Sequence, residues 1–173
     1  MGNSIQRLIY NLSVTAPLTL VLAFVWYQQL DTIVIPLALV VLGIVLTVLL
    51  YASFGYAVKN TESISFRAVN ISSKDGWLIA YVISYLLPFA SIGLKNFNIL
   101  VTGAVAIGLI LAVSFINTAI PHPLLFIRGY HFYAVSGANG VANYILLSKK
   151  KALRNNKQIK SVKRLFEYLL LEA

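Results

Sequence analysis

The fold is decided by the stretch Thr32–Val58, which reads TIVIPLALVVLGIVLTVLLYASFGYAV. Its 27 residues carry no charge and lie between Asp31 and Lys59. As an α-helix rising 1.5 Å per residue, the stretch would be roughly 40 Å long, whereas the hydrocarbon core of a bilayer is about 30 Å thick. The stretch therefore predicts a helix that crosses a membrane.

Charged residues bound three further apolar blocks, each long enough for one crossing. Because lipid offers no hydrogen-bond partner to the backbone, each block should be helical. Pro121 and Pro123 should end the last of these helices. The predicted fold class is an α-helical membrane protein with four transmembrane helices, at about residues 8–29, 33–57, 77–94 and 99–120.

The composition and the missing motifs disfavour an enzyme. The chain is 59% hydrophobic and 11% charged, whereas a soluble domain is about 25% charged. It has no Cys, which excludes disulfides and thiolate metal sites. No charge lies inside a predicted helix, and nucleophile-elbow and phosphate-loop patterns are absent. We therefore expect no catalytic, cofactor or metal site, and we interpret His122 and His131 as surface or interfacial residues.

The distribution of basic residues predicts the orientation in the membrane. With both termini on one side, all but Lys95 of the 14 Lys and Arg residues lie on that side. The positive-inside rule then places both termini in the cytoplasm of a multi-pass membrane protein. We expect a transmembrane domain at 1–120, with a cytoplasmic loop at 58–76 that is either interfacial and amphipathic or simply polar. A cytoplasmic tail should follow at 121–173.

The tail contains signals for a hairpin and a helix. Gly129–Ser136 and Val141–Ser148 are rich in aromatic and β-branched residues, and Asn139-Gly140 favours the turn between them. A β-hairpin is therefore expected within 129–148. Residues 156–171 predict an amphipathic C-terminal helix, because apolar residues recur there at helical spacing. These apolar residues are Ile159, Val162, Phe166 and Leu169.

The basic tail leaves three interpretations open: attraction to anionic lipid, docking of an acidic protein partner, and direct nucleic-acid binding, which is the least favoured. Nucleic-acid binding normally combines a basic groove with stacking aromatic residues, and direct contact is not expected here. The candidate partner-binding residues are Arg128, Lys149, Lys150, Lys151, Arg154, Lys157, Lys160, Lys163 and Arg164.

Two side-chain stripes stand out on the predicted helices. Ala104, Gly108 and Ala112 recur every four residues, which favours close helix packing either within the chain or between subunits. Trp77, Tyr81 and Tyr85 have the same spacing in the third helix. That aromatic stripe favours ordinary packing, with a ligand groove or a lipid-sensing face as the alternative.

Two segments carry a family resemblance. Ser72–Phe89, SSKDGWLIAYVISYLLPF, leads from a polar loop into a Tyr-rich helix, and Pro121–Tyr133, PHPLLFIRGYHFY, joins the last helix to the hairpin. With the basic tail, this layout resembles the KwaA-type membrane component of the bacterial Kiwa anti-phage defence system. The resemblance implies a non-enzymatic inner-membrane sensor or scaffold that forms a homo-oligomer such as a tetramer. It also implies that the basic tail recruits a cytoplasmic DNA-binding partner, KwaB.

Two rival functions remain open on the sequence. An oligomeric pore or channel would have a modest polar lining, formed by Thr102, Ser114, Asn117 and Thr118. A carrier or membrane enzyme is disfavoured, because the chain shows no internal repeat and no charge within its apolar blocks.

Overall fold

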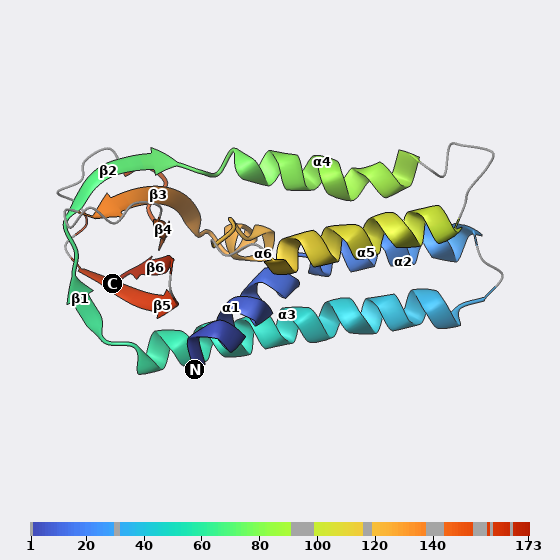
Figure 1. Ribbon diagram of the computed structural model, residues 1–173, viewed down its shortest axis with the longest axis horizontal. Helices are drawn as coiled ribbons and strands as arrows, with labels where there is room; N and C mark the ends of the chain where they lie inside the picture. The colour runs from blue at the N-terminus through green and yellow to red at the C-terminus, as the bar shows by residue number, and fades with distance from the viewer. Residues whose placement is uncertain are drawn as a thin grey trace.

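The structure combines a set of long helices with a β-sheet at one end of them (Figure 1). It is a computed structural model that describes residues 2–29, 32–90, 99–115, 119–137, 144–153, 159, 161–166 and 168–173. The helices are α1 (Gly2–Ser13), α2 (Ala16–Gln29), α3 (Val34–Asn60), α4 (Trp77–Ala90), α5 (Ile99–Phe115) and α6 (Pro123–Ile127). The strands are β1 (Ser63–Ser65), β2 (Ala68–Ser73), β3 (His131–Gly137), β4 (Tyr144–Ser148), β5 (Ser161–Phe166) and β6 (Leu169–Glu172).

In the part of the chain that the structure describes, two helical segments are long and apolar enough to cross a membrane. They are Ser4–Gln29, with a mean hydropathy of 1.9, and Val34–Asn60, with a mean hydropathy of 2.8. Within Val34–Asn60, only 17% of the most apolar stretch of 18 residues is buried. A core helix of a soluble protein would bury much more of such a surface, so the exposure of α3 favours lipid as its surroundings.

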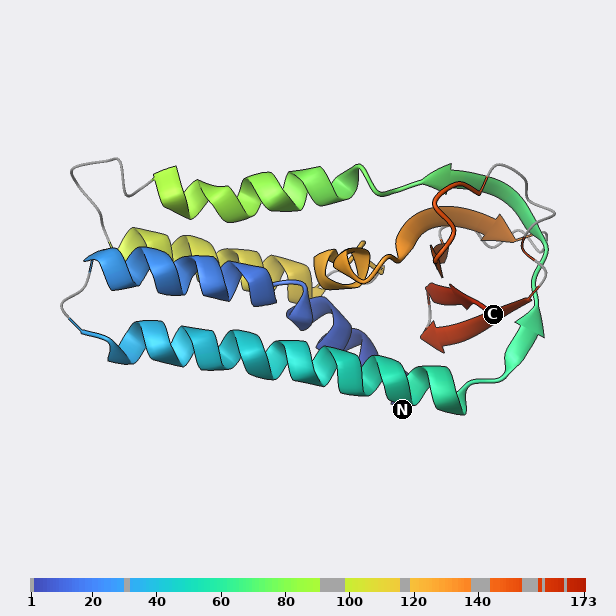
Figure 2. The same cartoon turned by 180° about the vertical axis from the view of Figure 1, so that it is seen from behind.

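The first of these segments is broken near its middle. The predicted helix 8–29 is two helices, and the backbone N–H groups of Val14 and Thr15 donate to the carbonyls of Asn11 and Leu12 in the turn between them. Pro17 explains the break, because it has no N–H to donate and its ring crowds the carbonyl four residues earlier. Figure 2 shows α1 leaving the direction of α2 and running toward α3.

The prediction of four crossings is not supported, since only two segments within the described residues meet the length required. The described parts of the other two predicted helices are α4, with 14 residues, and α5, with 17, and a crossing takes about 20. Residues 91–94 and 116–118 of these predictions lie outside the described residues. Ala119 and Ile120 are not helical, because the prolines that follow favour an extended backbone.

The sheet is mixed and has six strands in the order β1-β5-β6-β4-β3-β2. β4 and β6 run parallel, and the other neighbours are antiparallel. The edge strands β1 and β2 are joined by only Phe66 and Arg67, a link that spans at most about 11 Å. Six flat strands would be about 24 Å wide, so the sheet must curl to bring its edges together.

In its central strands the sheet is apolar and covered on both faces. One face places Phe132, Leu147 and Leu169 against the helices, where they pack with Leu50 of α3 and Leu125 of α6. The other face is covered by the chain that follows β4 and by residues next to β1 and β2. Its cluster consists of Ala68, Tyr133, Val135, Leu146, Leu153, Ile159, Val162 and Leu170, with Phe66, Ile71 and Tyr144 at its margin.

The C-terminal helix predicted at 156–171 is wrong, because strands β5 and β6 occupy most of its described residues. Leu169, Leu170 and Leu171 are all buried, alternating between the two covered faces of the sheet. A short apolar run in a strand buried on both faces also satisfies helical spacing, which explains the error. Residues 156–158, 160 and 167 of the predicted helix lie outside the described residues.

The loop predicted at 58–76 and the predicted tail form one sheet. β1 and β2 come from the loop and pair with β5 and β3 of the tail, so the sheet does not divide at residue 120. The two strands of the predicted hairpin are β3 and β4, which pair antiparallel from His131↔Ser148 to Val135↔Tyr144. Its turn, including Asn139 and Gly140, lies outside the described residues.

Gly43 of α3 provides a test of how closely α2 and α3 pack. A Cβ atom at Gly43 would lie 2.5 Å from the Thr19 Oγ1 atom and 3.3 Å from the Ala16 carbonyl oxygen. We expect Gly43→Ala to lower the free energy of unfolding in detergent by about 1–3 kcal/mol through overpacking. Gly55→Ala on the same helix meets nothing within 4 Å and should leave stability unchanged or higher.

Adding Thr19→Ala should recover part of the loss, since it removes the nearer clashing atom. The measurement is thermal unfolding of each variant in one mild detergent, with Thr19→Ala alone as the reference for the double variant. Equal effects of Gly43→Ala and Gly55→Ala would contradict a close crossing at Gly43.

Candidate partner-binding site

The cluster Lys149–Lys151 follows β4, and contacts within the chain hold it in place. The Lys150 side chain pairs with the Glu172 carboxylate, which also accepts a hydrogen bond from the Ser148 hydroxyl. The Tyr133 hydroxyl donates to the Lys150 carbonyl oxygen at 2.8 Å. Lys149 and Lys151 are exposed on this fixed segment. The structure thus presents two ammonium groups on an ordered backbone.

Two other predicted partner-binding residues contact α3. The Arg128 guanidinium lies over the Tyr51 ring, 4.2 Å from its centre. The Lys163 ammonium donates to the Val58 carbonyl oxygen at 2.8 Å, near the end of α3. Lys163 therefore serves the contact between the sheet and the end of α3, where positive charge suits a helix C-terminus, and Arg128 serves the contact between α6 and α3.

The remaining predicted basic residues are only partly described. Arg164 is exposed on β5, where it has contacts within the chain. Arg154, Lys157 and Lys160 lie outside the described residues. Of the nine predicted residues, Lys149 and Lys151 thus have the clearest exposure on an ordered backbone.

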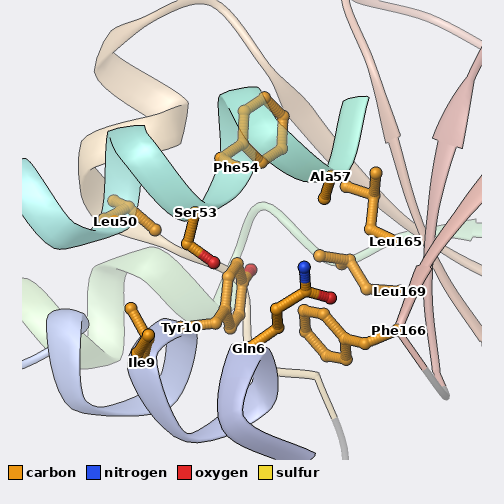
Figure 3. A pocket seen from close by; sticks show the side chains of 10 residues that line it. All are labelled: Gln6, Ile9, Tyr10, Leu50, Ser53, Phe54, Ala57, Leu165, Phe166 and Leu169. Atoms are coloured by element: carbon orange, nitrogen blue, oxygen red, sulfur yellow. The ribbon is translucent and has the colours of Figure 1, made fainter. Parts of the chain in front are cut away.

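Sequence reasoning missed a buried contact between α1, α3 and the sheet. Figure 3 shows Tyr10 and Gln6 of α1 reaching between α3 and the strands, around a cavity of about 20 Å³. That volume suits about one water molecule. The Tyr10 ring meets the Phe166 ring edge-on at 5.2 Å, and its hydroxyl donates to the Ile120 carbonyl oxygen at 2.6 Å.

His122 also belongs to this contact and is completely buried. Its interpretation as a surface or interfacial residue is therefore wrong. Its Nδ1 accepts from the Leu124 backbone N–H at 3.2 Å and so caps α6. Its Nε2 must then carry the proton and donate to the Ser13 hydroxyl at 2.9 Å, which in turn donates to the Tyr10 carbonyl. Burial lowers the pKa of His122 to about 3.

This arrangement makes His122 a structural donor. A general base for Ser13 would need an unprotonated Nε2, whereas here the cap on Leu124 fixes the opposite tautomer. The only signal in the sequence was Pro123, which favours the first position of a helix and makes His122 the N-cap.

His131 is the second histidine whose interpretation changes, because it pairs with a carboxylate. Its Nδ1 lies 2.7 Å from Asp75 Oδ2, and Asp75 Oδ1 accepts the Phe132 N–H at 2.8 Å. The Lys74 N–H donates to the Phe132 carbonyl at 2.8 Å. These bonds fix the start of α4 against the start of β3. Within the described residues, no three His, Asp or Glu side chains are grouped as a metal site would require.

The predicted packing stripe does not pack within the described chain. Ala104, Gly108 and Ala112 are exposed on α5, and a Cβ atom at Gly108 would meet nothing within 4 Å. Ala106 instead is buried, against Leu18 and Leu22 of α2. The side chains of Thr102 and Ser114, and residues Asn117 and Thr118 of the suggested pore lining, lie outside the described part of the chain.

Comparison with protein families gives one match, to the anti-phage protein KwaA, and it covers residues 6–171. The chain belongs to the KwaA family. The match spans the helices and the sheet together. It supports a role in anti-phage defence. No curated protein and no solved structure matches the chain.

The buried state of His122 predicts a pH dependence for this KwaA-family protein. An unfolded histidine binds a proton below about pH 6.5, whereas folded His122 stays neutral down to about pH 3. Stability should therefore fall as the pH drops from 6.5 toward 3, by up to about 1.4 kcal/mol per pH unit from this group.

The test is thermal unfolding in detergent across pH 4–8, with His122→Asn as the comparison. Asn can still cap α6 but does not titrate, so its unfolding curve should have a shallower acid slope. A variant with the same slope as the parent would show that His122 is not the group responsible.

Proposed function

We propose that this KwaA-family protein is a non-enzymatic membrane sensor and scaffold of anti-phage defence that recruits a cytoplasmic partner to its sheet. The observation that carries the proposal is a folded sheet with exposed lysines, attached to one end of long apolar helices. The resemblance described above implies a DNA-binding partner of the KwaB type. An acidic surface on that partner would complement Lys149 and Lys151.

We further propose that α2, α3, α4 and α5 each cross the bacterial inner membrane, with both termini cytoplasmic. The two views support this arrangement, because the four helices run alongside one another and both chain termini lie at the sheet end (Figures 1 and 2). Exposed apolar side chains on α4 and α5 support it too. They include Ile79, Val82, Ile83, Leu100, Val105, Ile107 and Leu111.

The proposed scaffold is a homo-oligomer, such as a tetramer, with α5 at the contact between subunits. The support is the row of small residues that α5 turns outward at Ala104, Gly108 and Ala112. Small side chains let helix backbones approach closely in lipid, where helix association depends on packing.

Partner docking is tested by reversing the charge of the exposed lysines. Lys149→Glu with Lys151→Glu should reduce the partner recovered with the tagged protein by at least tenfold, because each reversal replaces attraction by repulsion. The matched control is Lys149→Arg with Lys151→Arg, which keeps the charge and should keep the partner. Point substitutions are preferable to removal of the tail, since β3 to β6 carry most of the sheet core.

The measurement is affinity purification in mild detergent from cells that express both proteins, with quantification of the partner band. Folding is checked by the unfolding temperature of each variant. Undiminished recovery with the double Glu variant would contradict docking at these lysines.

A further inference from the structure

A recess opens between the start of α4 and the chain that follows α5. Its volume is about 310 Å³, within the range of small-molecule sites. Its wall combines one basic, two aromatic and several buried apolar residues. The lining residues are Lys74, Trp77, Tyr81, Ala119, Ile120, Pro121 and Ile145.

The recess lies where the helices meet the sheet. Trp77 is the first residue of α4, and Ile145 belongs to β4 of the sheet. In the proposed orientation this level is the cytoplasmic membrane interface. Trp and Tyr rings are enriched there, and so are lysines that reach lipid phosphates.

The charges around the recess favour an anion. The Lys74 ammonium lies over the Trp77 ring, 5.9 Å from its centre, and the ring is 58% exposed. The neighbouring acid, Asp75, directs both carboxylate oxygens to His131 and the Phe132 N–H, as described above. Its charge is therefore held at β3 and is compensated by hydrogen bonds.

The other walls favour a molecule with an apolar part. Ala119, Ile120 and Ile145 are at most 8% exposed, and the Ile120 carbonyl is already bonded to Tyr10. These residues offer hydrocarbon beside a single cation.

We propose that this recess binds one anionic phospholipid, with the phosphate at Lys74 and the glycerol and upper acyl region against Ile120 and Ile145. The lipid would fill the space beside α4 and connect α4 to the segment that follows α5. The site is separate from Lys149 and Lys151. It requires the proposed membrane location but no partner.

The test is native mass spectrometry of the purified protein in detergent, titrated with phosphatidylglycerol or with phosphatidylcholine. We expect one phosphatidylglycerol per chain to be retained in preference to phosphatidylcholine. Lys74→Gln should weaken that retention about fivefold, from the loss of one interfacial lysine. Lys149→Gln is the matched control, because Lys149 also lies over an aromatic ring, that of Tyr130 at 5.6 Å, but lines no part of the recess.

Each other outcome overturns the proposal. Equal loss of bound phosphatidylglycerol in Lys74→Gln and Lys149→Gln would mean that lipid binding depends on net charge alone. Full retention of the lipid by Lys74→Gln would mean that the lipid binds elsewhere. Cross-linking of a probe at Trp77 to a second chain, without retained lipid, would assign the recess to a subunit contact. Failure of partner docking with normal lipid retention would contradict only the proposed function.

Discussion

The structure depends on the packing of one face of the sheet against the ends of the helices. Phe132, Leu147 and Leu169 from the sheet meet Leu50 and Leu125 from the helices, and each of these side chains is at most 1% exposed. Burying a side chain of this size contributes about 1.5–3 kcal/mol. Without the helices, this face of the sheet would be exposed to water. The sheet and the helices are therefore one folding unit, and a partner on the sheet is connected to α1 and α3 through packed side chains.

Polar groups within this apolar contact determine its geometry. Tyr10, Ser13 and His122 are almost wholly buried and satisfy one another or nearby backbone carbonyls. An unpaired polar group in such a place costs about 1–3 kcal/mol, so any shift of α1 against residues 120–124 would leave several groups unsatisfied. The apolar packing supplies stability, and the hydrogen bonds select a single arrangement.

The sequence revealed the features that depend on local pattern. The charge-free run of α3 and the two strands β3 and β4 could be predicted because their signals lie within one segment. The sheet could not be predicted in full, since β1 and β2 come from a short polar loop and pair with strands about 60 to 100 residues later. The helix predicted over Leu169–Leu171 was wrong for a related reason. Both faces of β6 are covered by elements that no local pattern identifies. Likewise, nothing near His122 indicated Ser13, its partner 109 residues away.

The net positive charge is better understood as two groups than as one basic tail. Lys74 and Arg128 each lie over an aromatic ring, those of Trp77 and Tyr51. Trp77 begins α4, and Arg128 follows α6 at the link to β3, the level at which a membrane surface would lie. Lys149 and Lys151 instead are exposed next to the sheet, on either side of Lys150, whose side chain pairs with Glu172. Cations held against rings at the level of lipid headgroups suit anionic lipid, whereas an exposed cation on an ordered strand end suits a protein. Attraction to anionic lipid and docking of a protein partner were alternative explanations of the basic residues in the sequence. Both can therefore apply, at different residues of the same chain.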